Sequence, residues 1–472
     1  MKIYLFAIGG SGARVLRSLT MLLAAGVELP QGTELVPIIL DPDQGAGNLT
    51  ETIGLLESYK SLRDKANTVG HLTTFTSDVS PLPDQGFLIP LPGVANTKFQ
   101  DYIGLHAGMP GASQALIRAL FSQENLDLDM QVGFKGNPNI GSIVLGQFVE
   151  TKVFQNFMYD FAQAGGDKRI FIISSIFGGT GASGFPTLLK SLRANRGLIG
   201  DAHIGALSLQ PYFAVQNDPS SAIDSTTFYA KTRAALNYYR ENIIQNGDID
   251  DFYFLGDTAP DTLDNEEGGA AQRNPAHFIE LAGALSIIDF ARRPQREPGA
   301  RRAAQMHEFG VATDATQLRF ESLGSDTQRL LACPLTAMYL MRRYVERFDL
   351  ESSADAWLKN IQPTLDPVFV AELKDFLGEY EQWLRELGSS AGRSFAPIHL
   401  DQTADNLFDC VEGYPVTLGF MDKFSKQNYA LYTDRLNDRA KKVGNPQTEG
   451  ELLNVLSDVS YDLCVQKIGL PS

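Results

Sequence analysis

Two glycine-rich turns each follow an apolar run of the sequence and precede a helical pattern. They are GGSG at 9–12 and GGTGASG at 178–184. A chain segment without Cβ atoms brings backbone N–H groups close to a phosphate, and the positive end of the next helix favours an anion. The hydroxyls of Thr180 and Ser183 add side-chain donors. Two such turns in one sheet predict a di- or triphosphate held from two sides, although tight turns also need glycine for structural reasons alone.

Two further turns carry polar residues after or before regular elements. GFKGNPNIG at 133–141 precedes a helical segment, and DPDQ at 41–44 ends a strand-like run. In a dinucleotide fold, an acidic residue at the end of the second strand binds a ribose hydroxyl. Both segments are equally compatible with ordinary surface turns, where Asn-Pro, Gly and Asp are common. If the strands are parallel, their carboxyl ends meet at one edge, and all four turns would line one site.

Strand-like and helix-like segments alternate through the first two-thirds of the chain. The strand candidates are short apolar runs, typical of strands covered on both faces: Ile3–Ile8, Leu35–Leu40, Arg169–Ile176, His203–Leu209 and Asp251–Leu255. Helical spacing predicts helices over Ala13–Ala25, Thr50–Ala66, Ala112–Phe121, Phe185–Leu192, Ser225–Ile244 and Asn274–Phe290. The alternation predicts an α/β fold with a parallel sheet and helices on both faces.

The last third of the chain is dominated by helical patterns. They cover Thr327–Phe348, Phe369–Leu387, Asn428–Lys441 and Glu449–Ile468. Pro334 is expected to kink the first of these helices or to mark its start. A chain of 472 residues is long enough for two or three domains. We expect an α/β domain over 1–295, a connecting loop and helix over 296–348, and a mainly helical domain over 349–472.

The composition excludes several classes of protein. Hydrophobic residues make up 43% and charged residues 20%, which is ordinary globular usage. The 40 basic and 56 acidic residues give a net charge of −16, which disfavours direct nucleic acid binding through a basic surface. No window approaches the roughly 18–20 apolar residues of a membrane span. The three dispersed cysteines form neither a disulfide framework nor a zinc site, and we expect a soluble, cytoplasmic protein.

The four turns, taken in their order along the chain, resemble the nucleotide-binding loops of the tubulin and FtsZ superfamily of GTP-binding filament proteins. GGTGASGFP at 178–186 is similar to the tubulin signature GGGTG[ST]G with its FtsZ continuation, and GFKGNPNIG resembles the FtsZ loop GAGANPxxG. AIGGSGARVL at 7–16 resembles the first glycine-rich loop, DPDQ stands where FtsZ has NTDxQ, and LQPY at 209–212 echoes TKPF. The resemblance covers residues 1–290 and implies a Rossmann-like GTPase domain.

The resemblance implies a role for each turn. Residues 10–12 would contact the α and β phosphates, 178–183 would wrap the phosphates from the other side, and 136–138 would sense the γ-phosphate. Asp41 and Gln44 would lie near the ribose or near a magnesium ion that bridges phosphate oxygens. The nucleotide-binding residues implied for these turns are Gly9, Gly10, Ser11, Gly12, Asp41, Gln44, Gly136, Asn137, Pro138, Gly178, Gly179, Thr180, Gly181, Ala182 and Ser183.

The positions that would hold the guanine base depart from the family. FtsZ uses an Asn after its sixth strand and a second Asn in its central helix. Here Asp257 and Phe278 stand at these positions, with Asn274 nearby, and Phe177 replaces the first glycine of the signature. By the resemblance, Asp257 would accept hydrogen bonds from guanine N1 and N2, and Phe278 would stack on the base.

The family's catalytic loop has no counterpart in this sequence. In that family one subunit supplies the acidic motif NxDxxD to the nucleotide of its neighbour. The nearest acidic candidates here are Asp289, Glu321 and Asp326, each of which is also compatible with a helix surface or a helix cap. The catalytic residues are therefore unassigned, and no protein ligand for a metal is identified. GTPase activity and filament formation do not carry over from the resemblance.

Three functions are compatible with these residues. The leading hypothesis is a protein that binds GTP or GDP with Mg²⁺ and acts as a nucleotide-dependent switch or an assembly component, with self-association into an oligomer or filament. The second is a degenerate tubulin-like scaffold whose helical C-terminal region binds a protein partner without hydrolysis. The third is an NAD-type dinucleotide-dependent oxidoreductase. The second glycine turn argues against it, as does Val15 in place of the third fingerprint glycine.

Overall fold

The computed structural model describes most of the chain: residues 1–67, 71–131, 133–199, 202–216, 225–258, 261–265, 268–294, 303–309, 311, 315–347, 357, 365–417, 428–444 and 446–471. The expected domain boundaries at 295/296 and 348/349 lie outside these residues. Among the helices in these ranges, none combines the length and the apolar character needed to cross a membrane.

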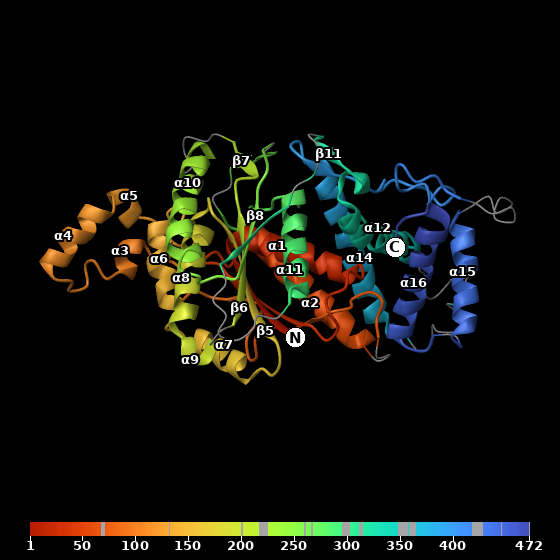
Figure 1. Ribbon diagram of the computed structural model, residues 1–472, viewed down its shortest axis with the longest axis horizontal. Coiled ribbons are helices and arrows are strands. Elements are labelled where there is room, and N and C mark those ends of the chain that lie inside the picture. Colours follow the sequence, from red (N-terminus) through yellow and green to blue (C-terminus); the bar gives the residue numbers. More distant parts are fainter. Residues whose placement is uncertain are drawn as a thin grey trace.

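A parallel sheet of eight strands forms the centre of the α/β part (Figure 1). Its order is β10-β8-β6-β5-β1-β2-β3, with β4 also paired to β2, and every one of these pairs is parallel. The predicted fold class is confirmed, and each expected strand is found within one residue of its bounds. The strands are β1 (Lys2–Ile8), β2 (Glu34–Leu40), β3 (Asp78–Val79), β4 (Leu88–Ile89), β5 (Lys168–Ser175), β6 (His203–Leu209), β8 (Asp251–Leu255) and β10 (Gln305–Glu308).

Helices cover both faces of this sheet, which explains why the central strands β1, β2, β5 and β6 are buried along almost their whole length (Figure 1). One face carries α1 (Gly9–Ala24), α2 (Gly47–Ala66) and α11 (Phe278–Arg292); the other carries α6 (Pro138–Phe148), α7 (Lys152–Gln163), α8 (Gly179–Ala194) and α10 (Phe228–Tyr239). On the second face, the rings of Tyr4 and Phe6 lie 5.3 and 4.9 Å from the ring of Phe157 in α7.

The two glycine turns form the first turns of helices and are not loops that precede them. Helix α1 begins at Gly9 and α8 at Gly179, whereas the helical pattern of the sequence begins at Ala13 and Phe185. Glycine is a poor helix former, so the first turn of each helix carries no periodic signal. The helix N-termini therefore lie within the glycine turns themselves.

The central helix α11 begins four residues later than the sequence pattern predicts. Its first residue is Phe278, and the Nδ1 atom of His277 accepts a hydrogen bond from the Ile279 N–H at 3.1 Å. The carboxylate of Glu280 accepts one from the His277 N–H at 3.0 Å. This reciprocal capping fixes the start of the helix and leaves Asn274 in the loop before it.

The C-terminal region is largely helical, as predicted, and packs directly on the α/β part (Figure 1). The Trp383 indole donates to the Ser18 hydroxyl at 3.3 Å, and Arg17 pairs with Glu386 at 2.7 Å. Pro334 lies inside α12 and does not mark its start. The buried side chains of both parts belong to one continuous core. The C-terminal helices are α12 (Ser325–Val345), α14 (Pro367–Ser389), α15 (Asn428–Lys442) and α16 (Glu449–Leu463).

Gly205 in β6 provides a test of the packing between the sheet and α11. A Cβ atom added there would lie 2.6 Å from the Phe290 ring and 2.8 Å from the Phe171 ring. We expect Gly205→Ala to lower the free energy of unfolding by about 1–3 kcal/mol, as overpacking of a core does, in urea denaturation. In α2, a Cβ at Gly54 would meet nothing within 4 Å. Gly54→Ala is therefore the control and should raise stability by about 0.5–1 kcal/mol. An unchanged midpoint for Gly205→Ala would contradict the packing.

Candidate functional site

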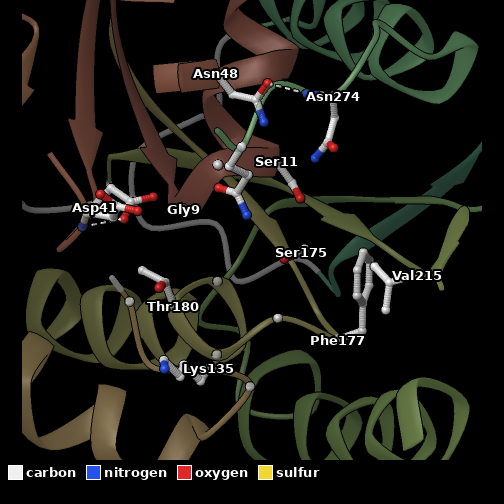
Figure 2. Close-up of a pocket in the computed structure, with 18 of the residues that line it drawn as sticks. Gly9, Ser11, Asp41, Asn48, Lys135, Ser175, Phe177, Thr180, Val215 and Asn274 are labelled. Atoms are coloured by element: carbon white, nitrogen blue, oxygen red, sulfur yellow. Dashed lines mark hydrogen bonds between the residues drawn. The ribbon is translucent and has the colours of Figure 1, made fainter. Parts of the chain in front are cut away.

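A pocket opens where the winding of the sheet reverses direction (Figure 2). Strands β1 and β5 are neighbours, with Ile8 opposite Ser174. From β1 the chain continues through α1 to β2 on one side, and from β5 through α8 to β6 on the other. Both strands end at this edge of the sheet. The chain then continues in opposite directions from the two strands, so a crevice is left between the two glycine turns. In open α/β sheets, ligands bind at such a switch point.

The structure brings most of the residues predicted from the four turns into this one pocket. Its lining includes the turn that starts α1, the turn that starts α8, the end of β2 and the turn before α6. The predicted residues that line it are Gly9, Gly10, Ser11, Asp41, Gly136, Gly178, Gly179, Thr180, Gly181 and Asn274.

The turn that starts α8 is in direct contact with two of the other turns. A Cβ atom at Gly9, where φ is +79°, would lie 3.5 Å from the Thr180 Cβ. A Cβ at Gly179 would lie 3.0 Å from the backbone nitrogen of Gly136 and 3.1 Å from that of Asn137. The N-termini of α1, α6 and α8 therefore converge around the pocket. Their unpaired N–H groups and the positive ends of their dipoles make this edge favourable for an anion.

Two buried carboxylates lie at the end of β2, beside these turns. Asp41 and Asp43 are 6% and 7% exposed, and both line the pocket. Asp43 accepts from the Gly269 N–H at 2.6 Å, and Asp41 accepts from the Asp43 N–H at 2.9 Å. Burial raises the pKa of Asp41 to about 7; the backbone hydrogen bond from Asp43 opposes this shift and the charge of Asp43 adds to it. A buried acidic pair of this kind is stabilised by a cation or a proton.

A buried ion pair joins α1 to the central helix α11. The guanidinium of Arg14, which lines the pocket, lies 2.6 Å from the Glu280 carboxylate and donates to the Pro275 carbonyl at 2.7 Å. The Tyr212 hydroxyl donates to the same carboxylate at 2.8 Å. Burial raises the pKa of Glu280 and the Arg14 charge opposes that shift. The pair holds α1 against the start of α11.

Polar groups on other sides of the pocket complete its lining. The Asn48 side chain accepts a hydrogen bond from the Asn274 N–H at 2.8 Å (Figure 2). Lys135 brings a positive charge from the turn before α6. Lys231 does not line the pocket, but its ammonium donates to the Gly136 carbonyl at 3.2 Å and supports that turn. The pocket therefore combines backbone N–H groups, cationic side chains and an acidic pair, which is the mixture that a metal-bound polyphosphate requires.

Several predicted residues lie behind the pocket or beside it. The Ser183 hydroxyl donates to the Gly179 carbonyl at 2.7 Å, so it supplies no donor to the pocket. A Cβ at Gly12 would lie 3.0 Å from the backbone of Ala7, so this glycine allows α1 to pack on β1. Gln44 is exposed. The predicted turn residues that do not line the pocket are Gly12, Gln44, Asn137, Pro138, Ala182 and Ser183.

Two residues expected to hold the base are engaged elsewhere. The Asp257 carboxylate, 3% exposed, accepts from Arg393 at 2.8 Å. The Phe278 ring is buried and packs 6.2 Å from Phe309 and 5.5 Å from Phe395. The sequence alignment missed both arrangements because the partners follow more than 30 residues later in the chain. Of the three base candidates, Asn274 alone lines the pocket.

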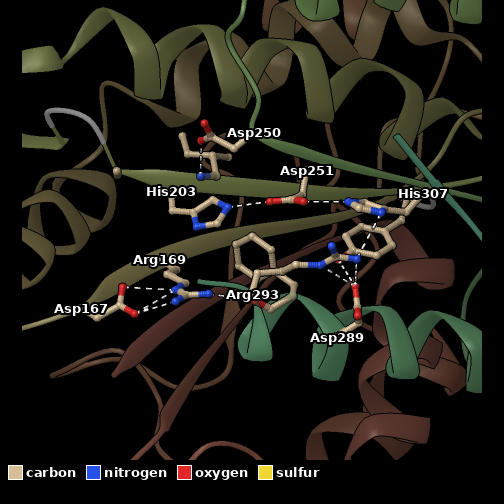
Figure 3. A network of polar contacts seen from close by, with 12 residues as sticks. Asp167, Arg169, His203, Asp250, Asp251, Asp289, Arg293 and His307 are labelled. Carbon is tan, nitrogen blue, oxygen red and sulfur yellow. Dashed lines mark hydrogen bonds and ion pairs between the residues drawn. The ribbon is translucent and has the colours of Figure 1, made fainter. Parts of the chain in front are cut away.

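The acidic candidates for hydrolysis also lie away from the pocket lining. Asp289 accepts from the Tyr253 hydroxyl at 2.6 Å and pairs with Arg293 at 2.7 Å (Figure 3). This network includes residues at the starts of β6 and β8, the edge of the sheet opposite the pocket. Asp326 is an exposed residue of the first turn of α12, and Glu321 lies in the short helix Phe320–Ser322.

Residues that the sequence analysis did not assign contribute much of the lining. Arg14, Asp43, Asn48 and Lys135 lie within or just after the predicted turns, so their proximity to a turn was the signal available. An aromatic group could not be predicted as a group, because its members come from three separate segments and Phe177 alone adjoins a predicted glycine turn. It consists of Phe177, Phe213 and Phe228.

The Arg14–Glu280 pair gives a testable prediction about stability. Glu280→Gln would leave the buried Arg14 charge without its counter-charge, and we expect it to lower the free energy of unfolding by about 3–5 kcal/mol in urea denaturation. The double variant Arg14→Met/Glu280→Leu removes both charges and should be more stable than the single variant. Equal stability of the single variant and the parent would show that the pair is not needed to compensate the buried charge.

Comparisons with known proteins give little information about this chain. No protein-family model matches it, and no curated protein matches it. Among the solved structures that match is CetZ2 from Haloferax volcanii, described as a GTPγS-bound protofilament, at 13% sequence identity and a TM-score of 0.31. The match covers 62% of this chain and 58% of the length of that protein. With so low an identity and TM-score, we conclude nothing about this chain from the match.

Proposed function

We propose that the chain binds a guanine nucleotide, GDP or GTP with Mg²⁺, and acts as a nucleotide-dependent switch or assembly component. The convergence of three helix N-termini on one pocket at the switch point of the sheet is the observation that carries this proposal. Backbone N–H groups at helix N-termini bind phosphates in many unrelated nucleotide sites. The order of the glycine turns, which resembles the tubulin and FtsZ superfamily, supports guanine as the base.

In this proposal, each turn contacts a different part of the phosphate chain. Gly10 and Ser11 bind the α and β phosphates, and 178–181 bind them from the other side. The turn over 133–137 faces the γ-phosphate. Its backbone has positive φ angles at Lys135 (+43°) and Gly136 (+73°), a conformation that costs energy for the lysine. A γ-phosphate that pairs with Lys135 would favour this conformation, and its loss would favour another, as in known phosphate switches.

The acidic pair fits a magnesium ion that accompanies the phosphates. Mg²⁺ prefers oxygen ligands and is commonly held by one or two carboxylates together with phosphate oxygens. Asp41 and Asp43 are buried beside the phosphate turns and would otherwise repel a polyphosphate. In this proposal the ion supplies charge neutralisation, and the two carboxylates position it beside the phosphates.

We assign no catalytic residue for hydrolysis within this pocket. Asp289, Glu321 and Asp326 do not line it, so any role of theirs would require a second copy of the chain to bring them to the nucleotide. A dinucleotide cofactor is less favoured than a polyphosphate, because the first and third turns both contact the second turn and enclose the phosphate region. If the chain binds no nucleotide, the scaffold function is the alternative that we favour.

Nucleotide content of the purified protein is the direct test. The protein is denatured, and its supernatant is separated by anion-exchange chromatography. We expect GDP or GTP from the parent. We expect none from Gly10→Glu, because a Cβ at Gly10 meets nothing closer than the Gln272 side-chain oxygen at 4.0 Å, so the new carboxylate would enter the pocket and repel phosphate.

The control is Gly54→Glu, which adds the same charge in open space on α2. Position 10 is preferable to Gly181 for the disruptive variant. A Cβ at Gly181 would lie 2.5 Å from the Ser175 carbonyl and would disturb the fold itself. A parent protein that is empty and also fails to bind added GTP with Mg²⁺ would refute the switch proposal and favour the scaffold.

The raised pKa of Asp41 predicts a pH dependence. Its folded-state pKa of about 7 exceeds the ordinary value of 3.8, so between pH 4 and 7 the folded state holds a proton that the unfolded state has lost. The free energy of unfolding that this group contributes therefore falls as the pH rises from about 4 to about 7. Above pH 7 the contribution is constant. Mg²⁺ displaces the proton, so we expect Mg²⁺–GTP affinity to rise with pH up to about 7 and then to level off.

Asp41→Asn tests this assignment, because the amide oxygen can still accept the Asp43 N–H. We expect weaker Mg²⁺–GTP binding whose affinity rises less between pH 5 and 8 than that of the parent, measured by titration calorimetry. The variant should also be more stable than the parent at pH 8 without ligand. A parent-like pH profile in Asp41→Asn would place the titrating group elsewhere.

A further inference from the structure

Three phenylalanines from separate segments form one side of the pocket, which we call the aromatic wall. Phe177 follows β5, Phe213 begins β7 (Phe213–Val215) and Phe228 begins α10. The Phe177 ring centroid lies 5.0 Å from that of Phe228 and 5.4 Å from that of Phe213. Val215 and Leu263 extend the apolar surface, and Figure 2 shows Val215 next to the Phe177 ring.

The aromatic wall is supported from behind. The Tyr212 ring packs 5.0 Å from Phe213 and 6.2 Å from Phe177, and its hydroxyl is fixed by Glu280. β7 pairs in parallel with β9 (Asp261–Leu263), which sets Val215 opposite Leu263. Phe213 is half-buried and both neighbouring rings are buried, so the wall presents a fixed apolar surface to the pocket.

Most of the other side chains that line the pocket are polar, although Phe134 of the turn before α6 also lines it. Asp41 and Asp43 form one side, and Asn48 and Asn274 form another. Arg14 is committed to its buried ion pair with Glu280. Phe213, Val215 and Leu263 keep partly exposed apolar area. An aromatic ligand covers such area favourably, because it packs against a phenylalanine ring by face or by edge.

Phe177 links this surface to the phosphate turns. It is the residue that replaces the first glycine of the signature, and Gly178 and Gly179 follow it directly. One continuous segment therefore contributes both an aromatic ring and the backbone N–H groups of a helix N-terminus. A ligand that joins a ring to a polyphosphate matches this order of contacts.

We propose that the base of the bound nucleotide packs against the aromatic wall of Phe177, Phe213 and Phe228, and that Asp257 and Phe278 do not contact it. This inference rests on the proposed function. In this inference, these three residues make the site bind a polyphosphate that carries a ring more tightly than inorganic polyphosphate. They come together only in the folded chain.

The test compares a nucleotide with a ligand that has no ring. Affinities for Mg²⁺–GTP and for inorganic tripolyphosphate are measured by titration calorimetry on the full chain. We expect Phe213→Leu and Phe228→Leu to weaken GTP binding at least about fivefold, as loss of base–aromatic stacking does, and to leave tripolyphosphate binding unchanged. Phe278→Leu is the matched control and should bind both ligands like the parent.

A second readout does not depend on loss of binding. Phe213→Trp keeps an aromatic ring in the wall, and we expect GTP, but not tripolyphosphate, to change its fluorescence. The native Trp357 and Trp383 are 1% and 0% exposed and give a constant background.

Equal weakening for both ligands in the wall variants, or a loss of GTP binding in Phe278→Leu alone, would overturn the inference and leave nucleotide binding intact. Failure of the parent to bind either ligand would overturn the proposed function together with this inference.

Discussion

The parallel pairing of β1 with β5 is the constraint on which the site depends. Ile8 lies opposite Ser174, so the two strands end at the same level. The glycine turns that follow them therefore lie side by side. A shift of one residue in this register would turn the side chains of one strand to the opposite face and separate the turns. Burial on both faces fixes the register, because apolar side chains fill both sides of each strand.

The glycines of the turns serve packing as much as ligand binding. A Cβ at Gly181 would collide with the Ser175 carbonyl, and a Cβ at Gly141 would lie 2.2 Å from the Ser183 hydroxyl. These glycines allow α6 and α8 to approach each other and β5 closely. The close approach is what brings the helix N-termini to one point. Gly10, by contrast, has open space beside it, so packing does not require a glycine there.

Buried charges connect the pocket to the C-terminal helices. Arg14 and Arg17 lie on successive turns of α1; the first pairs with Glu280 of α11 and the second with Glu386 of α14. Glu386 also accepts from the Ala276 N–H at 2.9 Å, directly before the start of α11. The start of α11, helix α1 and α14 therefore share one polar network.

The sequence alone determined the α/β class, the parallel sheet, the helical C-terminal region and the positions of the glycine turns. These follow from local signals: apolar runs, helical spacing and glycine clusters act over a few residues. The tertiary structure decided which residues of each turn face the pocket, that Ser183 bonds its own helix, and that Asp257 and Phe278 have partners far along the chain. It also assembled the aromatic wall. Contacts between distant segments depend on how helices pack on the sheet, and no local pattern encodes that packing.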